Sequence, residues 1–180
     1  TSNPSATMPA GTSFVSRVDG VDYQFVTISD ITKQNTGNSI PFDSTEVYEG
    51  TFATTKYLVD SNDVDQRFML TDVRADTSTL TVRVQNSTTD TTTTTYTKAT
   101  DITQLSSSST VYYLQETESG KFEIYFGDGA TSAAVSDGNI VQLNYVITNK
   151  TAANGASSFT SPSSIDGVTG ITVTTVSNAA

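Results

Sequence analysis

The sequence contains no cysteine, no histidine and no tryptophan. Without cysteine the chain can form neither a disulfide bond nor a thiolate zinc site. Without histidine it lacks the commonest general base, the usual nitrogen ligand for metals and any Ser-His-Asp triad. Catalysis would have to rest on carboxylates, lysine or tyrosine. The composition thus removes the commonest catalytic and metal-binding side chains, and together with the motifs and the resemblance considered below it leads us to expect no enzyme, no cofactor and no residue that is catalytic or binds a metal.

Basic residues and long apolar segments are also scarce. Nine Lys and Arg stand against 19 Asp and Glu, which gives a net charge of −10. A charge of this sign repels phosphate backbones and anionic lipid surfaces. No run approaches the roughly 18 apolar residues of a membrane helix, and the first residues lack the positive start and apolar core of a signal peptide. We expect binding to neither nucleic acid nor membrane.

The apolar residues that are present favour strands. Leucine, isoleucine, valine and phenylalanine make up 40 of the 180 residues, and valine is the most frequent of the four. β-Branched residues suit a pleated sheet better than a helix. No stretch shows sustained helical spacing, and the prolines fall between strand-like segments. We predict an all-β (mainly β) fold, an antiparallel sandwich or barrel-like domain with long loops.

The distribution of turn-forming residues predicts three regions. Residues 1–11 contain two prolines and a glycine and are expected to be a flexible lead-in. Residues 12–150 are expected to form the main β domain. Residues 151–180 are expected to be a polar connection that ends in a final strand at 171–176.

Alternating apolar residues mark the strands expected within the main domain. At 80–85, Leu80, Val82 and Val84 share one face. Asp19-Gly20 is expected to turn a hairpin between two neighbouring strands. The predicted strands are 14–18, 23–28, 46–59, 67–71, 80–85, 121–126 and 140–148.

A threonine-rich segment at 86–100 interrupts this pattern, with five consecutive threonines at 91–95. Two interpretations are open. Threonine favours strands, which indicates an exposed hairpin tip. The same composition fits a mobile loop, because it offers little to bury. Of the two, the hairpin tip is the favoured prediction.

Two turn motifs lie in the last third of the main domain, Phe126-Gly127-Asp128-Gly129 and Asp137-Gly138-Asn139. Asp128 and Asp137 suggest calcium ligands, but calcium takes about six to eight oxygens. These are the only two acidic side chains between Gly127 and Asn139. A structural turn is predicted instead, in which Gly127 and Gly129 adopt positive φ angles and Asp128 accepts hydrogen bonds from nearby amides.

Two further groups of side chains invite a functional interpretation. A glycosidase needs two carboxyl groups across a cleft, and tyrosines are frequent at binding surfaces. Acidic residues on exposed strands are ordinary, and no tryptophan is present to stack on a sugar, so a glycosidase is not expected. For the tyrosines, packing in or beside the core is predicted in preference to a ligand or interface patch. The two groups are Glu116, Glu118 and Glu123, and Tyr112, Tyr113, Tyr125 and Tyr145.

Several short motifs follow one another in an order that is more specific than any one of them. They are Met8–Phe14, Tyr23–Thr27, Val47–Gly50, Asp76–Val82, Phe126–Gly129, Asp137–Asn139 and Asn154–Gly155. In this order they resemble the baseplate J-like family, the wedge subunits in the tail baseplates of contractile-tailed, T-even-like bacteriophages. One departure is Ala130–Ala134, where members often carry a second glycine after the turn.

The resemblance implies a structural virion protein, a domain of a baseplate wedge subunit that connects neighbouring subunits in the baseplate ring. It implies other wedge subunits as partners, together with further copies of the same chain in a homo-oligomeric ring. It also implies a location in the phage tail baseplate after assembly in the host bacterial cytoplasm. Family members continue past a segment like 177–180, so we expect a fragment of a larger subunit. The alternative is an immunoglobulin-like or adhesin-type β domain that binds a glycan.

Overall fold

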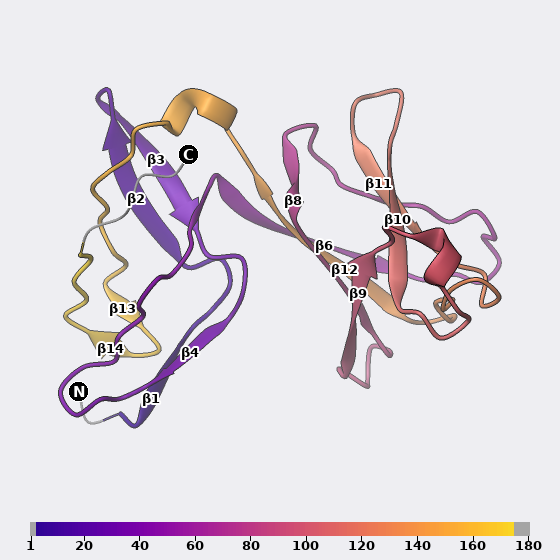
Figure 1. The fold of residues 1–180 in the computed structure, drawn as a ribbon, viewed down its shortest axis with the longest axis horizontal. Helices are drawn as coiled ribbons and strands as arrows, with labels where there is room; N and C mark the ends of the chain where they lie inside the picture. Colours follow the sequence, from indigo (N-terminus) through magenta and orange to yellow (C-terminus); the bar gives the residue numbers. More distant parts are fainter. Residues whose placement is uncertain (1–2, 175–180) are drawn as a thin grey trace. The chain divides into compact units, whose positions relative to one another are not determined.

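The computed structural model describes residues 3–174, which form strands joined by loops (Figure 1). Within this range the helices are two short 3-10 turns, η1 (Ile102–Gln104) and η2 (Lys150–Ala153). Neither is long or apolar enough to cross a membrane. The prediction of an all-β fold is confirmed.

The chain folds into two compact units. Unit 1 contains the described residues of 1–52 and 146–180, and unit 2 contains residues 53–145. The chain enters unit 2 inside strand β6 (Thr51–Leu58) and leaves it inside strand β12 (Ile140–Ile147). The chain thus forms two units where we predicted a single main domain at 12–150. Unit 2 is contiguous in the sequence, and the segments before and after it together form unit 1. Both crossings lie inside strands, where no change of composition marks a boundary.

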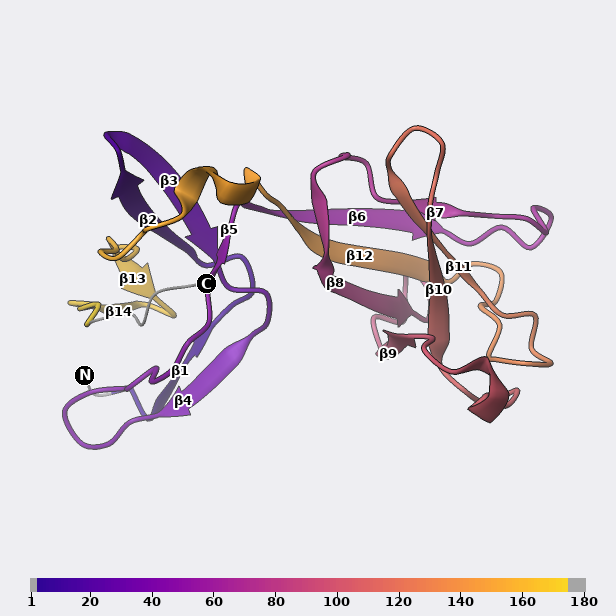
Figure 2. The ribbon, with the colours of Figure 1, turned by 45° about the horizontal axis from the view of Figure 1, so that its top comes forward.

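A seven-stranded sheet runs through unit 2 and curls into a nearly closed barrel (Figure 2). Strands β6 and β7 stand at opposite ends of the sheet order. Tyr57 on β6 nevertheless donates a hydrogen bond of 2.6 Å to the carbonyl oxygen of Met69 on β7, which links the two ends. In sheet order the strands are β6, β12, β8 (Ala75–Gln85), β9 (Thr93–Lys98), β10 (Val111–Glu116), β11 (Phe122–Phe126) and β7 (Phe68–Met69).

The threonine-rich segment forms a hairpin, as favoured above. Strands β8 and β9 pair antiparallel, with Val82 opposite Tyr96 and Gln85 opposite Thr93. The next pairing departs from the antiparallel expectation, because β9 and β10 run parallel, with Val111 opposite Thr97. The segment between them includes η1 and returns the chain to the end of the sheet at which β9 begins. Strand β10 therefore runs in the same direction as β9.

Alternate side chains of the strands fill the barrel of unit 2. Val82 and Val84 are buried as the alternation predicts, and Leu80 on the same face is partly exposed. Tyr145 is fully buried in β12, and its hydroxyl oxygen accepts a hydrogen bond of 3.1 Å from the amide of Thr71. Its polar end is therefore satisfied inside the core, as a buried tyrosine requires. Other fully or almost fully buried residues are Phe68, Leu70, Ile124, Val141 and Leu143.

Unit 1 is built from three small antiparallel sheets. The turn between β2 and β3 confirms the predicted hairpin, since Asp19 has φ 51° and Gly20 φ 85°. Two successive positive φ angles are typical of tight hairpin turns. The sheets are β1 (Ser5–Met8) with β4 (Ile31–Gln34), β2 (Ser13–Val18) with β3 (Val21–Val26) and β5 (Tyr48–Glu49), and β13 (Ser164–Ile165) with β14 (Val168–Thr169).

The flexible lead-in predicted at 1–11 is wrong for residues 5–8, which form β1. Ala6 and Met8 are buried, at 1% and 3% exposure, so this short strand contributes to the core. The prolines at 4 and 9 flank the strand instead of interrupting it, a position that strands tolerate. Residues 1 and 2 lie outside the described residues.

The C-terminal part of unit 1 also differs from the prediction. Residues 171–174 are not in a strand, and the rest of the final strand predicted at 171–176 lies outside the described residues. The short hairpin of β13 and β14 precedes it, turned by Asp166 (φ 49°) and Gly167 (φ 73°). An Asp-Gly pair between apolar residues is a hairpin signal that the prediction overlooked.

Glu49 and Gly50 connect two segments of unit 1 that are far apart in the sequence, because both contact residues 147–149. The carboxylate of Glu49 accepts hydrogen bonds from Thr148 Oγ1 (2.7 Å) and from the amide (2.8 Å) and side chain (2.7 Å) of Asn149. Gly50 has φ 125° and lies against the backbone of Ile147. The core beside them is small, with Met8, Phe14, Phe25, Ala153 and Ile165 as its buried members.

Candidate functional site

The Phe126–Gly129 turn follows β11 and folds back on itself. Gly129 has φ 84°, and its amide donates to the carbonyl oxygen of Ser132 at 2.9 Å. Asp128 accepts hydrogen bonds from the amides of Ala130 (2.9 Å) and Thr131 (3.3 Å). The turn is therefore self-contained, because its carboxylate serves its own backbone.

Gly127 is required for a different reason from the one predicted. Its φ angle is not positive, so that part of the prediction is wrong. A Cβ atom at this position would overlap Ser132 Oγ and lie 2.8 Å from the carbonyl oxygen of Ser132. Ser132 is fully buried. Sequence reasoning missed Ser132, and the run of small residues at 130–134 was the one signal that could have indicated close packing.

Phe126 anchors this turn in the core of unit 2. Its ring meets Phe68 edge-on at 5.5 Å and Tyr96 edge-on at 5.0 Å between ring centroids. Edge-to-face pairs at this spacing are favourable beyond the area they bury. The start of the turn is therefore fixed by packing and its tip by hydrogen bonds.

The Asp137–Asn139 turn joins the ends of other strands. The amide of Gly138 donates to the carbonyl oxygen of Val59 at 3.0 Å, and the amide of Val59 donates back to Asn139 at 2.9 Å. The side-chain amide of Asn139 donates to the carbonyl oxygen of Asn86 at 2.8 Å. This turn thus ties the end of β6 and the β8–β9 loop to the start of β12.

The two predicted turns do not form one metal site. Asp128 turns toward its own loop, whereas Asp137 accepts a hydrogen bond of 3.0 Å from the amide of Ser61. Among residues 3–174 no three acidic side chains come close enough to hold a metal ion. Each of the two aspartates instead accepts hydrogen bonds from backbone amides of a loop.

The hydrogen bonds of Asp128 lower the pKa of its carboxyl group, chiefly through the amide of Ala130. A carboxyl with a lowered pKa stabilises the fold above its unfolded value of about 3.9, and the contribution is lost as pH falls through the folded pKa. We predict that the free energy of unfolding decreases on acidification below about pH 4. Four further turn aspartates share this direction of shift, namely Asp60, Asp72, Asp90 and Asp101.

Denaturant unfolding from about pH 5 to about pH 2 measures this dependence. Asp128→Asn keeps an acceptor oxygen but cannot titrate, so its stability is expected to depend less steeply on pH than that of the natural chain. Superimposable pH profiles for the two proteins would contradict the assignment to Asp128.

The outer face of the β10–β11 hairpin carries a stack of side chains. The rings of Tyr113 and Tyr125 lie face to face with centroids 5.1 Å apart and planes 19° apart. The guanidinium carbon of Arg67 lies 4.5 Å from the centroid of the Tyr125 ring. We call these three residues the tyrosine platform. Tyr112 and Tyr145 are buried and Tyr113 and Tyr125 are partly buried, so the predicted packing in or beside the core is confirmed for all four.

The predicted glutamates fall into different settings. Glu123 is 13% exposed and lies 3.9 Å from Arg67 Nε, and it also accepts a hydrogen bond from Gln115. Glu116 and Glu118 are exposed beside the hairpin turn. Sequence reasoning missed Arg67, because its place over Tyr125 depends on β7 lying next to β11.

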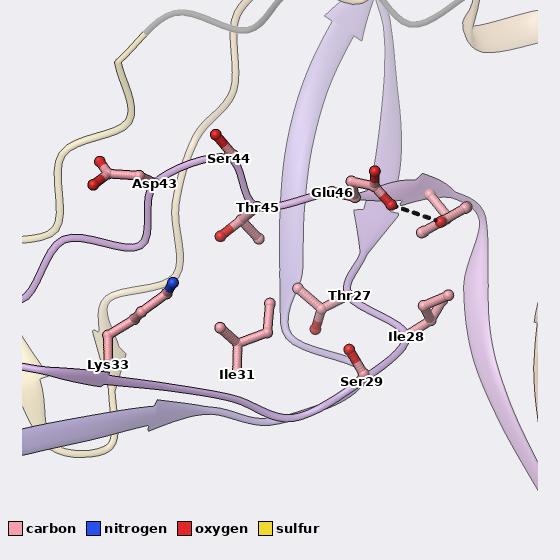
Figure 3. Close-up of a pocket in the computed structure, with 10 residues that line it drawn as sticks. Thr27, Ile28, Ser29, Ile31, Lys33, Asp43, Ser44, Thr45 and Glu46 are labelled. Atoms are coloured by element: carbon pink, nitrogen blue, oxygen red, sulfur yellow. Dashed lines mark hydrogen bonds between the residues drawn. The ribbon is translucent and has the colours of Figure 1, made fainter.

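Unit 1 contains a hollow of about 280 Å³, shown in Figure 3. Lys33 approaches it from β4, and Asp43 and Glu46 come from the loop before β5. Glu46 accepts a hydrogen bond of 3.1 Å from the hydroxyl of Tyr48. None of the three charged side chains is buried. Charged side chains that remain exposed in this way are typical of a solvated surface.

A comparison with family models identifies the class of protein. Residues 51–157 match the model of the bacteriophage baseplate wedge protein gp6, third domain. This match covers more than half of the chain and all of unit 2. The chain belongs to the family of bacteriophage baseplate wedge proteins and is a structural domain of the tail baseplate.

A curated relative agrees with the family. The chain is 37% identical over 82 residues to the baseplate wedge protein gp6 of Enterobacteria phage T4. The alignment covers 37% of this chain and 12% of the T4 protein. The matched part of the chain therefore spans about an eighth of the length of that relative.

Proposed function

We propose that this chain connects neighbouring wedge subunits in the baseplate ring and has no enzymatic activity. The observation that carries the proposal is the match of residues 51–157 to a baseplate wedge domain. The proposed partners are other wedge subunits and further copies of the subunit to which the chain belongs. The narrower assignment to the baseplate J-like branch rests on the motif order described above.

The physical demands of a baseplate favour this role. A ring that changes shape when the tail contracts must pass between two packed arrangements without dissociating. Such a subunit needs rigid elements that present an interface. In unit 2 the two turn motifs supply rigidity, because their side chains and amides bond to their own loops or to adjacent strand ends.

The charge of the chain fits the same proposal. A net charge of −10 disfavours contact with nucleic acid or with an anionic membrane. We propose that the chain acts through protein contacts alone, within particles assembled in the host cytoplasm.

Immunogold electron microscopy of phage particles tests the proposal. Antibodies against this chain are expected to place gold at the end of the tail distal to the head, on intact particles or on isolated baseplates. Serum absorbed with the purified chain is the control. Labelling of the head or tail sheath, or of neither intact nor dissociated particles, would refute it.

A further inference from the structure

Asn154-Gly155, the last of the ordered short motifs, forms the tip of a turn that follows η2. Asn154 has φ −59° and ψ 137°, and Gly155 has φ 93°. The amide of Ala156 donates a hydrogen bond of 3.3 Å to the carbonyl oxygen of Ala153. These angles and this hydrogen bond are typical of a type II turn, which favours glycine at its third position.

Both residues at the tip of this turn are exposed. In the part of the chain that the structure describes, neither the side chain of Asn154 nor the amide of Gly155 is hydrogen bonded. Asn86 is exposed as well, but its side chain donates to the carboxylate of Asp90 at 2.8 Å. The amide that follows Asn86, that of Ser87, donates to the carbonyl oxygen of Asp90 at 3.1 Å.

The two unbonded groups are the reactants of asparagine deamidation. The amide nitrogen of Gly155 attacks Cγ of Asn154 and forms a cyclic succinimide, while the bond from Cγ to Nδ2 breaks. The proton of the Gly155 amide passes through solvent to the leaving ammonia. Water then opens the ring at either carbonyl carbon and leaves aspartate or isoaspartate. The Asn154–Gly155 peptide must turn before the ring closes, and glycine permits this because no Cβ restricts its backbone.

The isoaspartate product changes the length of the chain at this turn. Its backbone runs through Cβ, so an extra atom separates Ala153 from Ala156. Ala153 is 5% exposed in the core of unit 1, and Ala156 packs against the same core. We therefore expect isoaspartate to break the hydrogen bond between these two residues and to displace the chain that follows.

Residues 156–171, here called the closing segment, cover the core of unit 1. Phe159 meets Phe25 edge-on, with the ring centroids 4.9 Å apart. The amide of Thr160 donates to the carbonyl oxygen of Val15 at 2.8 Å, and the amide of Val15 donates back at 3.1 Å. A displacement that begins at the turn would weaken these contacts.

We propose that Asn154 is a site of spontaneous deamidation, and that its isoaspartate product loosens the closing segment from the core of unit 1. The reaction needs only water and this chain, so it does not depend on the wedge function.

Peptide mass spectrometry of the full chain, aged in mildly alkaline buffer, measures the reaction. Asn154 is expected to convert at least about tenfold faster than Asn86, whose hydrogen bonds must break first. Asn154→Gln is expected to stay unconverted at this position over the same time, because the longer side chain closes a larger ring more slowly.

Gly155→Ala tests the attacking group. Its Cβ atom would meet nothing within 4 Å, and the methyl group hinders the attack, so conversion of Asn154 is expected to slow by about tenfold. Gly20→Ala is the matched control, since Gly20 also has a positive φ angle and open space. It is expected to leave the rate at Asn154 within about twofold. Thermal unfolding checks that each variant is folded. If Gly155→Ala is not, Asn154→Gln decides the result.

Hydrogen exchange tests the effect on the closing segment. In the aged chain the amides of Val15 and Thr160 are expected to exchange about tenfold faster than in the fresh chain, while those of β11 are unchanged. Fresh Asn154→Asp carries the same added charge without the longer backbone. Its exchange at these amides is expected to stay within about twofold of the natural chain.

Three results would overturn the proposal. The first is conversion at Asn154 that is no faster than at Asn86 or that is unchanged by Gly155→Ala in its folded form. The second is a chain converted to isoaspartate whose Val15 and Thr160 amides exchange as in the fresh chain. The third is fresh Asn154→Asp with exchange as fast as in the aged chain, because charge and not backbone length would then be the cause.

Discussion

Replacing Gly50 with alanine is expected to destabilise unit 1 by about 4 kcal/mol. A Cβ atom there would overlap the carbonyl oxygen of Ile147 and lie 2.7 Å from Val146 Cγ1. The backbone of Gly50 also has φ 125°, a region that residues with a side chain rarely adopt. The obstructing oxygen belongs to a strand backbone and cannot rotate away. Hydrogen exchange at the amides of β3 and β5 measures the loss, as faster exchange within unit 1.

Gly20→Ala is the matched control for this prediction. Gly20 has φ 85°, but nothing lies within 4 Å of the position that its Cβ atom would occupy. Its substitution is therefore expected to lower the free energy of unfolding by only about 1 kcal/mol, the cost of holding alanine in a left-handed backbone conformation. Equal costs for the two substitutions would show that the contact of Gly50 with Ile147 does not limit stability.

Gly127→Ala is expected to destabilise unit 2 by about 3 kcal/mol. The new methyl group would overlap Ser132 Oγ, and it would crowd the carbonyl oxygen that accepts the hydrogen bond of the Gly129 amide. Since Ser132 is fully buried, it can move only if the side chains packed around it also shift. The measurement is the midpoint of denaturant unfolding followed by tyrosine fluorescence, and exchange at β11 amides locates the effect.

Two companions make this prediction specific. Gly129→Ala lies in the same turn, and its Cβ atom would lie 3.7 Å from Ala134 Cβ, an ordinary contact distance. Only the cost of a left-handed backbone for alanine is therefore expected, a loss of about 1 kcal/mol in the free energy of unfolding. The double variant Gly127→Ala with Ser132→Ala removes the overlapping oxygen and is expected to recover part of the loss. If Gly129→Ala were the more damaging change, steric contact at Gly127 would not be what shapes the turn.

The features that sequence analysis could predict are those that depend on neighbouring residues. The Asp19-Gly20 hairpin needs only two residues that tolerate positive φ angles between strand-like segments. The burial of Val82 and Val84 follows from alternation along one strand. The hairpin of the threonine-rich segment follows from the strand preference of threonine.

The features that escaped prediction depend on residues far apart in the chain. The strand β1 exists because β4 lies beside it, and Ala6 and Met8 alone give too short a pattern to read. The place of Arg67 over Tyr125 requires the pairing of β7 with β11. The parallel pairing of β9 with β10 likewise depends on the path of the intervening loop, for which the residues carry no local signal.

The discontinuity of unit 1 has a consequence for synthesis on the ribosome. Chains emerge from the N-terminus, and contiguous units fold first. Unit 2 is one uninterrupted segment and can fold as soon as it emerges, whereas Met8, Phe14 and Phe25 must wait for Ala153 and Ile165 to complete their core. The apolar side chains of the N-terminal segment are therefore the last to be buried, and this segment is the part of the chain most prone to wrong contacts during translation.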